Sequence, residues 1–326
     1  MRTKQLLATA FLTLTIACIS TSYGEPEESP KNNPLGEPDA TQKPETLDKI
    51  EMNLDLTKLI SVPSGNGAKK LYSEAVELAI AYGDNFAEDA AQPFPEKNEK
   101  LTAILNKLEE AADMGIGDAK LSFDSLPAIS PKTMWTNHAT LYAITQIASN
   151  TSLSRRHAGD TAGAEKAMRA GLLWADRLFK NGDDFVAYKY AGIRSMAESL
   201  GAAQDLYMKG DATKKVIADE LYKEYRKAGD RWYAKVRIVL KPDLKINPAD
   251  LWNMAENDKD PAWQREGVMW LGVAQWTSAA GEQRTAIQNY LESLTNSSDP
   301  TIAKCAKEAH GIKREDIHAI AFSLPR

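Results

Sequence analysis

Apolar residues recur at intervals of three and four along much of this chain, which is the spacing of one face of an α-helix. The clearest pattern covers residues 164–179, and similar patterns cover residues 101–112 and 217–236. Convincing period-two alternation, typical of half-buried strands, is missing, and the short apolar run at 236–240 continues the helical pattern. The periodicity predicts an all-α fold with no significant sheet.

Predicted helix ends carry matching signals. Glycine can adopt the left-handed conformation that ends a helix, and a following aspartate can cap the next helix. A capping residue followed by proline is a typical helix start. Gly-Asp pairs begin at Gly83, Gly117, Gly159, Gly182, Gly210 and Gly229, and start signals at Ser130, Asn247, Asp260 and Asp299.

The helical segments also show signs of a repeat. Asp260-Pro261 and Asp299-Pro300 lie 39 residues apart (299 − 260), a spacing that resembles the helix pairs of HEAT repeats. Residues 159–172 resemble the second helix of a tetratricopeptide (TPR) repeat, and Leu-Gly pairs at 200 and 271 resemble part of its first helix. The intervals between Gly-Asp pairs are unequal, so any repeat is degenerate.

This resemblance implies stacked antiparallel helical hairpins, a TPR-like or HEAT-like α-α superhelix. Such stacks expose a concave surface, which implies binding of a protein or peptide. An irregular helical bundle without a groove is the alternative architecture. The helical-repeat domain is expected to span residues 46–326, with a possible subdivision near 241–248.

The first residues predict export. Arg2 and Lys4 precede an uncharged, mostly apolar run at 6–16 that is short for a membrane-spanning helix, so a cleaved signal peptide is favoured. Residues 14–18 resemble a bacterial lipobox, although Thr15 departs from its usual leucine. This resemblance implies a signal peptide of residues 1–18, lipidation of Cys18 and a membrane-anchored lipoprotein of the cell envelope.

A second cleavage site keeps another location open. Ser22 and Gly24 place small residues where ordinary signal peptidase prefers them, which predicts cleavage after residue 24 and a soluble periplasmic or secreted protein. Residues 19–45 are rich in proline and glutamate and contain few large apolar residues. This composition predicts a disordered linker in either case.

Composition and motifs exclude several classes of function. The formal net charge of −5 argues against a nucleic-acid binder with a large basic surface. Two cysteines and four histidines offer little for a metal site, and we expect neither a metal nor a cofactor. The familiar motifs of zinc peptidases, serine hydrolases and phosphate-binding loops are missing, so no catalytic residue is assigned.

Five residues are candidates for binding. Arg155 and Arg156 form the densest cationic spot in the middle of the chain and could bind a carboxylate or phosphate, although solvated arginines at a helix end are the plainer interpretation. Trp232, Trp263 and Trp270 could be platforms for a sugar or peptide. The favoured interpretation makes these tryptophans core fillers between helices, and His138 a packing residue.

The sequence therefore predicts a cell-envelope scaffold that binds a protein or peptide partner, attached to the membrane through Cys18. Two alternatives stay open: an all-α envelope hydrolase acting on glycans, and a small-ligand-binding protein with an aromatic pocket. The hydrolase requires a deep pocket where two titratable groups meet. The scaffold requires an open face rich in Tyr, Trp and Arg.

Overall fold

The computed structural model describes residues 48–65, 67–114, 121, 125–126, 130, 133–181, 186–208, 210–239 and 244–323. The chain divides into two compact units, residues 1–33 and 34–326, and every described residue belongs to the second. The predicted signal peptide, Cys18 and the linker at 19–45 lie outside the described residues.

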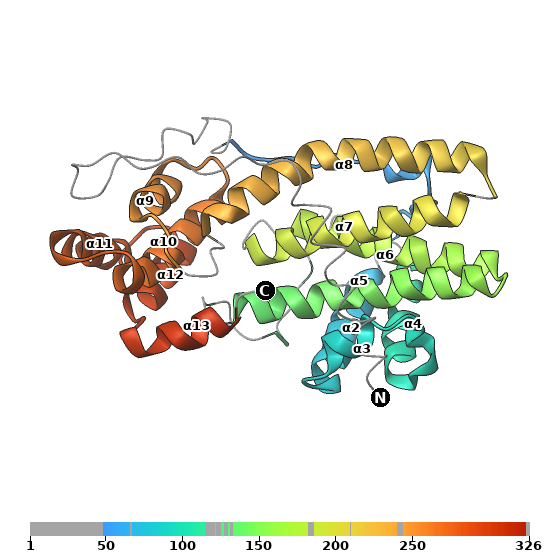
Figure 1. The fold of residues 1–326 in the computed structure, drawn as a ribbon, viewed down its shortest axis with the longest axis horizontal. Coiled ribbons are helices and arrows are strands. Elements are labelled where there is room, and N and C mark those ends of the chain that lie inside the picture. The colour runs from blue at the N-terminus through green and yellow to red at the C-terminus, as the bar shows by residue number, and fades with distance from the viewer. Residues whose placement is uncertain are drawn as a thin grey trace, which may run out of the picture. The chain divides into compact units, whose positions relative to one another are not determined.

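Within these ranges all regular elements are helices, so the all-α prediction is confirmed (Figure 1). None of the described helices is long and apolar enough to cross a membrane. The α-helices are α2 (Ala68–Tyr82), α3 (Phe86–Ala90), α4 (Glu99–Met114), α5 (Met134–His157), α6 (Thr161–Asn181), α7 (Val186–Tyr207), α8 (Ala212–Val239), α9 (Pro248–Asn257), α10 (Pro261–Thr277), α11 (Gly281–Leu294), α12 (Pro300–His310) and α13 (Ile317–Ser323). Short 3₁₀ helices are η2 (Leu56–Lys58), η3 (Pro95–Lys97) and η5 (Arg314–Asp316).

The apolar faces predicted from the sequence form the core. All members of the 101–112 face of α4 and of the 164–179 face of α6 are buried. On α8 the predicted face is buried from Leu221 to Val236, whereas Ile217 is half-buried. Burial of these continuous apolar stripes is the main force that holds the helices together.

The predicted capping signals are confirmed at several helix ends. Gly83 and Gly159 have φ angles of +96° and +84°, the left-handed region that glycine enters without strain. The carboxylate of Asp160 accepts a hydrogen bond from the Gly163 amide at 2.9 Å. Asp260 and Asp299 are N-caps whose carboxylates accept from the first amides of α10 and α12, at 3.0 and 2.8 Å.

The helix end predicted at Gly229-Asp230 is wrong, because both residues lie inside α8. A Cβ atom on Gly229 would meet the Tyr225 ring carbon Cζ at 3.0 Å, so this glycine makes room for the tyrosine one turn earlier. The pairs at Gly117 and Gly182 lie outside the described residues.

Consecutive long helices are antiparallel, as their cross-contacts show. Between α5 and α6, Ser152 near the connection donates to the Ala164 carbonyl at 2.9 Å, and Trp174 far from it donates to the Leu141 carbonyl at 3.2 Å. Between α6 and α7, Gly192 lies against the Phe179 backbone, so closely that a Cβ would lie 2.4 Å from its nitrogen. The chain therefore folds as helical hairpins.

Helices that hold equivalent places in successive hairpins are parallel. Contacts from α4 to α6 advance in the same direction on both helices, from Glu109–Lys166 to Asp113–Arg169. From α10 to α12 they advance from Arg265–Asp299 to Trp276–Ile312. The α2/α4 hairpin is therefore stacked on α5/α6, which packs in turn on α7/α8, and α9/α10 is stacked on α11/α12, whereas α7 and α8 touch α9 and α10 at only a few residues.

Buried charges join the α7/α8 hairpin to the turn between α9 and α10. Lys189 of α7 contacts Asp260 at 2.9 Å, and Lys235 of α8 contacts Asp258 at 2.6 Å. All four side chains are almost completely buried. We call these two ion pairs the ionic joint.

An N-terminal strap, residues 48–61, crosses several hairpins. At one end Asp48 accepts from Lys259, just before α10, at 2.5 Å. At the other end the Ser61 carbonyl accepts from Arg169 of α6 at 2.9 Å. Between them Ile50 and Met52 are buried, and the strap is visible in blue beside α8 (Figure 1). The strap therefore connects helices that are distant along the chain.

Candidate functional site

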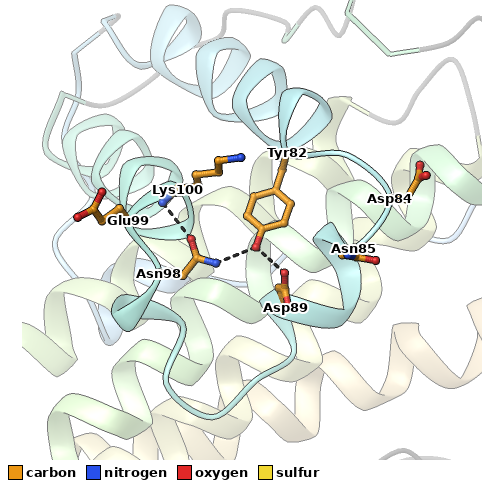
Figure 2. Close-up of a pocket in the computed structure, with 7 residues that line it drawn as sticks. All are labelled: Tyr82, Asp84, Asn85, Asp89, Asn98, Glu99 and Lys100. Carbon is orange, nitrogen blue, oxygen red and sulfur yellow. Dashed lines mark hydrogen bonds between the residues drawn. The ribbon is translucent and has the colours of Figure 1, made fainter.

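A cavity of about 550 Å³ lies where α2 ends and α4 begins (Figure 2). The Tyr82 hydroxyl donates to Asp89 at 2.5 Å and accepts from the Asn98 amide at 2.7 Å. The bond to Asp89 and burial together raise the pKa of Tyr82. The cavity is lined by Tyr82, Asp84, Asn85, Asp89, Asn98, Glu99 and Lys100.

The polar groups of this cavity satisfy one another rather than converge on an empty point. Figure 2 shows the Asp84 and Glu99 carboxylates turned away from Tyr82. The Lys100 ammonium lies 5.4 Å from the centre of the Tyr82 ring. Among the residues that the structure describes, no group of three or more His, Cys, Asp and Glu could hold a metal ion. This arrangement is a polar surface hollow.

A second cluster spans α5, α7 and α8. Four of its side chains are partly exposed, namely Tyr142, Arg194, Glu198 and Tyr233. The other two, His138 and Tyr190, are buried beneath them. We call this set the Tyr-Arg cluster, and it consists of His138, Tyr142, Tyr190, Arg194, Glu198 and Tyr233. It combines tyrosine and arginine, the residue types that protein interfaces use most as anchors.

Ring contacts hold the cluster together. The Arg194 guanidinium lies 4.0 Å from the centre of the Tyr142 ring, a cation–π contact. The His138 ring is stacked on Tyr190, with centroids 4.8 Å apart. Tyr190 in turn meets Tyr233 edge-on, with centroids 5.8 Å apart. The cluster therefore presents rigid side chains, which lose little conformational entropy when a partner binds.

Burial governs protonation in the cluster. Burial lowers the pKa of His138 well below its usual value, and the positive charge of Arg194 lowers it further, so His138 is neutral at pH 7. Burial raises the pKa of Glu198, although the Tyr142 hydroxyl, which donates to this carboxylate at 3.1 Å, and Arg194 oppose the rise. Burial also raises the pKa of Tyr190 to about 12.

Arg155 and Arg156, the predicted cationic spot, lie apart from this cluster and contact carboxylates of the same chain. Arg155 contacts Glu109 at 2.7 Å and Glu96 at 3.3 Å, and Arg156 contacts Asp205. These ion pairs tie α5 to α4, to η3 and to α7. Binding of an external anion by the two arginines stays a prediction.

The three candidate tryptophans are core residues, as the favoured interpretation predicted. Trp232, Trp263 and Trp270 are completely buried. The Trp232 and Trp263 rings lie 5.0 Å apart across the junction of α8 and α10, and Trp270 donates to Glu266 at 2.7 Å. They fill space between helices and offer no face to a ligand in this structure. His138 is also buried and packed against aromatic rings, as predicted.

The Tyr-Arg cluster was not recognised from the sequence. Tyr190, Arg194 and Glu198 follow one another at intervals of four on α7, which is a detectable signal of one helical face. Their neighbours Tyr142 and Tyr233 come from helices some 50 residues earlier and 40 residues later (190 − 142 = 48; 233 − 190 = 43). Only the hairpin packing brings them together.

The chain matches no protein-family model, and comparisons with curated proteins and with solved structures give no significant match.

Proposed function

We propose that this chain is a helical-repeat scaffold of the cell envelope that binds a segment of another protein on its Tyr-Arg cluster. The observation that carries the proposal is the partly exposed set of Tyr142, Arg194 and Tyr233 across α5, α7 and α8. Tyrosine and arginine supply much of the binding energy at protein interfaces. Stacked hairpins of the TPR-like or HEAT-like kind use such faces to hold peptides.

The cluster is better suited to a partner segment than the Tyr82 cavity is. Its aromatic rings are fixed by their neighbours, so a bound segment would not have to order them. The cluster also extends over three helices, which suits an extended or helical peptide. By contrast, the hydroxyl of Tyr82 is already used by Asp89 and Asn98. No described observation favours the glycan hydrolase or the small-ligand protein over the scaffold.

A displayed library of 12-residue peptides tests this function. We expect selection on the immobilised wild-type protein to enrich peptides whose affinity falls at least about tenfold, or 1.4 kcal/mol, in Tyr142→Ser and Tyr233→Ser. Tyr290→Ser is the matched control, because Tyr290 is a half-buried tyrosine stacked on Trp252 in other hairpins. Failure to enrich peptides, or equal losses in all three variants, would contradict the proposal.

The location in the envelope is part of the same proposal and rests on the sequence around Cys18. If Cys18 carries the acyl chains, Cys18→Ser abolishes partitioning into detergent with the membrane fraction, because the chains supply the membrane affinity. The circular dichroism of the folded body stays unchanged. An intact mass that begins at Glu25 without added acyl mass would instead establish a soluble exported protein.

A further inference from the structure

We propose that the segment held by the Tyr-Arg cluster is acidic and that Arg194 binds one of its carboxylates. The inference rests on the proposed function and names the chemistry of the partner. It follows from the unused hydrogen-bonding capacity of Arg194, from the hydroxyl groups beside it and from the pairing of other arginines in the same hairpins.

Among the described residues, Arg194 has no carboxylate at ion-pair distance. A guanidinium carries five N–H donors, and a partly buried one is costly to leave unpaired. Within the described residues no Asp or Glu oxygen lies within 4.0 Å of its nitrogens. Its contact with Tyr142 is the cation–π contact at 4.0 Å, in which the guanidinium lies over the ring. Most of its donors are therefore left for a ligand.

Neighbouring arginines show what this chain does with other partly buried guanidinium groups. Arg155 contacts two carboxylates, Arg156 contacts Asp205, and Arg169 contacts Asp113 at 2.8 Å. Each of these side chains joins two elements of the fold. Arg194 of α7 is also partly exposed, but it contacts no such carboxylate in the part of the chain that the structure describes. An external carboxylate would form an ion pair with the Arg194 guanidinium in the same way.

Two hydroxyl groups beside Arg194 suit the same ligand. Tyr233 is partly exposed, and its hydroxyl can donate a hydrogen bond to an acceptor. Burial raises the pKa of both Tyr190 and Tyr233, and the positive charge of Arg194 opposes the rise. Donors of hydrogen bonds and positive charge thus gather at one place, which attracts a carboxylate and repels lysine or arginine.

Glu198 limits how much negative charge the cluster can accept. Its carboxylate is held by Tyr142 and acts on Arg194 only from beyond ion-pair distance. It therefore offsets part of the positive charge without occupying the guanidinium. This balance fits a single Asp or Glu side chain, or a C-terminal carboxylate, within an otherwise uncharged peptide segment.

Peptides from the displayed library test the inference with the intact protein. We expect selected peptides to be enriched in Asp or Glu, and replacement of those residues by Asn or Gln to weaken binding to the wild type at least about tenfold. In Arg194→Gln the acidic and amide peptides should bind equally weakly. Arg226→Gln is the matched control, because Arg226 is an exposed arginine on α8 that already pairs with Asp230; it should keep the preference.

Arg194→Lys is the control for a folding defect, because lysine keeps the positive charge but lacks the planar fork of N–H donors of the guanidinium. We expect an intermediate loss of affinity for the acidic peptide and an unchanged thermal unfolding temperature. Selected peptides that bind at the cluster equally well as acid and amide would overturn the inference while the proposed function stands. Peptides whose binding ignores Tyr142→Ser and Tyr233→Ser would overturn both.

Discussion

Glu266 of α10 is a carboxylic acid placed inside the hydrophobic core. Its side chain is 2% exposed and accepts a hydrogen bond from the Trp270 indole at 2.7 Å. Burial raises the pKa of Glu266 to about 8, and the weaker effect of the indole opposes it. Below that pH the group is protonated, so the core holds a neutral acid rather than an unpaired charge.

This raised pKa predicts how stability varies with pH. Because the unfolded carboxyl ionises near 4.5, the contribution of Glu266 to stability is complete below pH 4.5 and is lost as the pH rises through about 8. One pKa unit corresponds to about 1.4 kcal/mol. We therefore expect the stability of Glu266→Gln, relative to the wild type, to be greater at pH 9 than at pH 5. Thermal unfolding of both proteins at pH 5 and at pH 9 measures this difference in stability.

Glu282→Gln, an exposed residue of α11, is the control and should leave the pH dependence unchanged. Parallel pH profiles of the wild type and Glu266→Gln would contradict the burial of a titrating carboxyl at this position.

Leu172 and Lys166 lie on opposite faces of α6. We therefore expect substitutions at the two positions to differ greatly in their effect on stability. Leu172 is completely buried, so Leu172→Asp places a charge in the core without a partner and should cost more than about 4 kcal/mol or prevent folding. Lys166 is 47% exposed and contacts Glu109 at 3.2 Å. Lys166→Ala should cost less than about 1 kcal/mol in urea unfolding. Similar losses would mean that the faces are assigned wrongly.

At the scale of helices, two equivalent caps make a matched experiment. Asp260 and Asp299 each cap a helix that begins with proline, but only Asp260 also neutralises a buried lysine, Lys189. Asp299 has only a long contact with Arg265, at 3.8 Å, so Asp299→Ala should cost little more than the loss of a cap, about 1 kcal/mol. Asp260→Ala also removes the carboxylate that neutralises the buried ammonium of Lys189, so we expect about 3–5 kcal/mol. Urea unfolding distinguishes them, and equal losses would show that the ion pair adds nothing.

The sequence predicted helices well where local chemistry and packing agree. On α6, periodicity, the Gly159 end and the Asp160 cap all indicate the same boundaries, and the helix begins at Thr161 as expected. Gly229-Asp230 carries the same local signal but lies within α8, because contact with Tyr225 explains that glycine. A Gly-Asp pair therefore predicts a helix boundary only where its glycine has no packing role within a helix.

The candidate site was less predictable than the helices. Arg155, Arg156 and the three tryptophans are distinctive residue types, but their contacts are internal to the fold. Arg194 was not predicted as a binding residue, because its proposed role depends on the lack of a nearby carboxylate among the described residues. That property belongs to the packing of α5, α7 and α8 and cannot be read from one helix.

At the scale of the molecule, the ionic joint connects the α7/α8 hairpin to the turn between α9 and α10. Burial raises the pKa of Asp258 to about 6 and lowers that of Lys235, which indicates a large desolvation cost for the pair. We expect Lys235→Met alone to destabilise by about 3–5 kcal/mol, because Asp258 then lacks its partner. The double variant Lys235→Met/Asp258→Leu should regain most of this loss in urea unfolding.

A double variant as unstable as Lys235→Met would contradict this account of the joint. An exposed pair on the same helix, Arg226 and Asp230, provides the control, since both single changes there should be nearly neutral.

The N-terminal strap constrains the order in which the chain can fold during synthesis. Most helix contacts join helices that are close along the chain, so the hairpins can form one after another as they leave the ribosome. Asp48, however, is paired with Lys259, which is made 211 residues later. The strap is therefore synthesised before the helices, and its Asp48 end has no docking site until α10 is about to begin. The strap therefore completes its contacts only after the helices from α2 to α9 have been made.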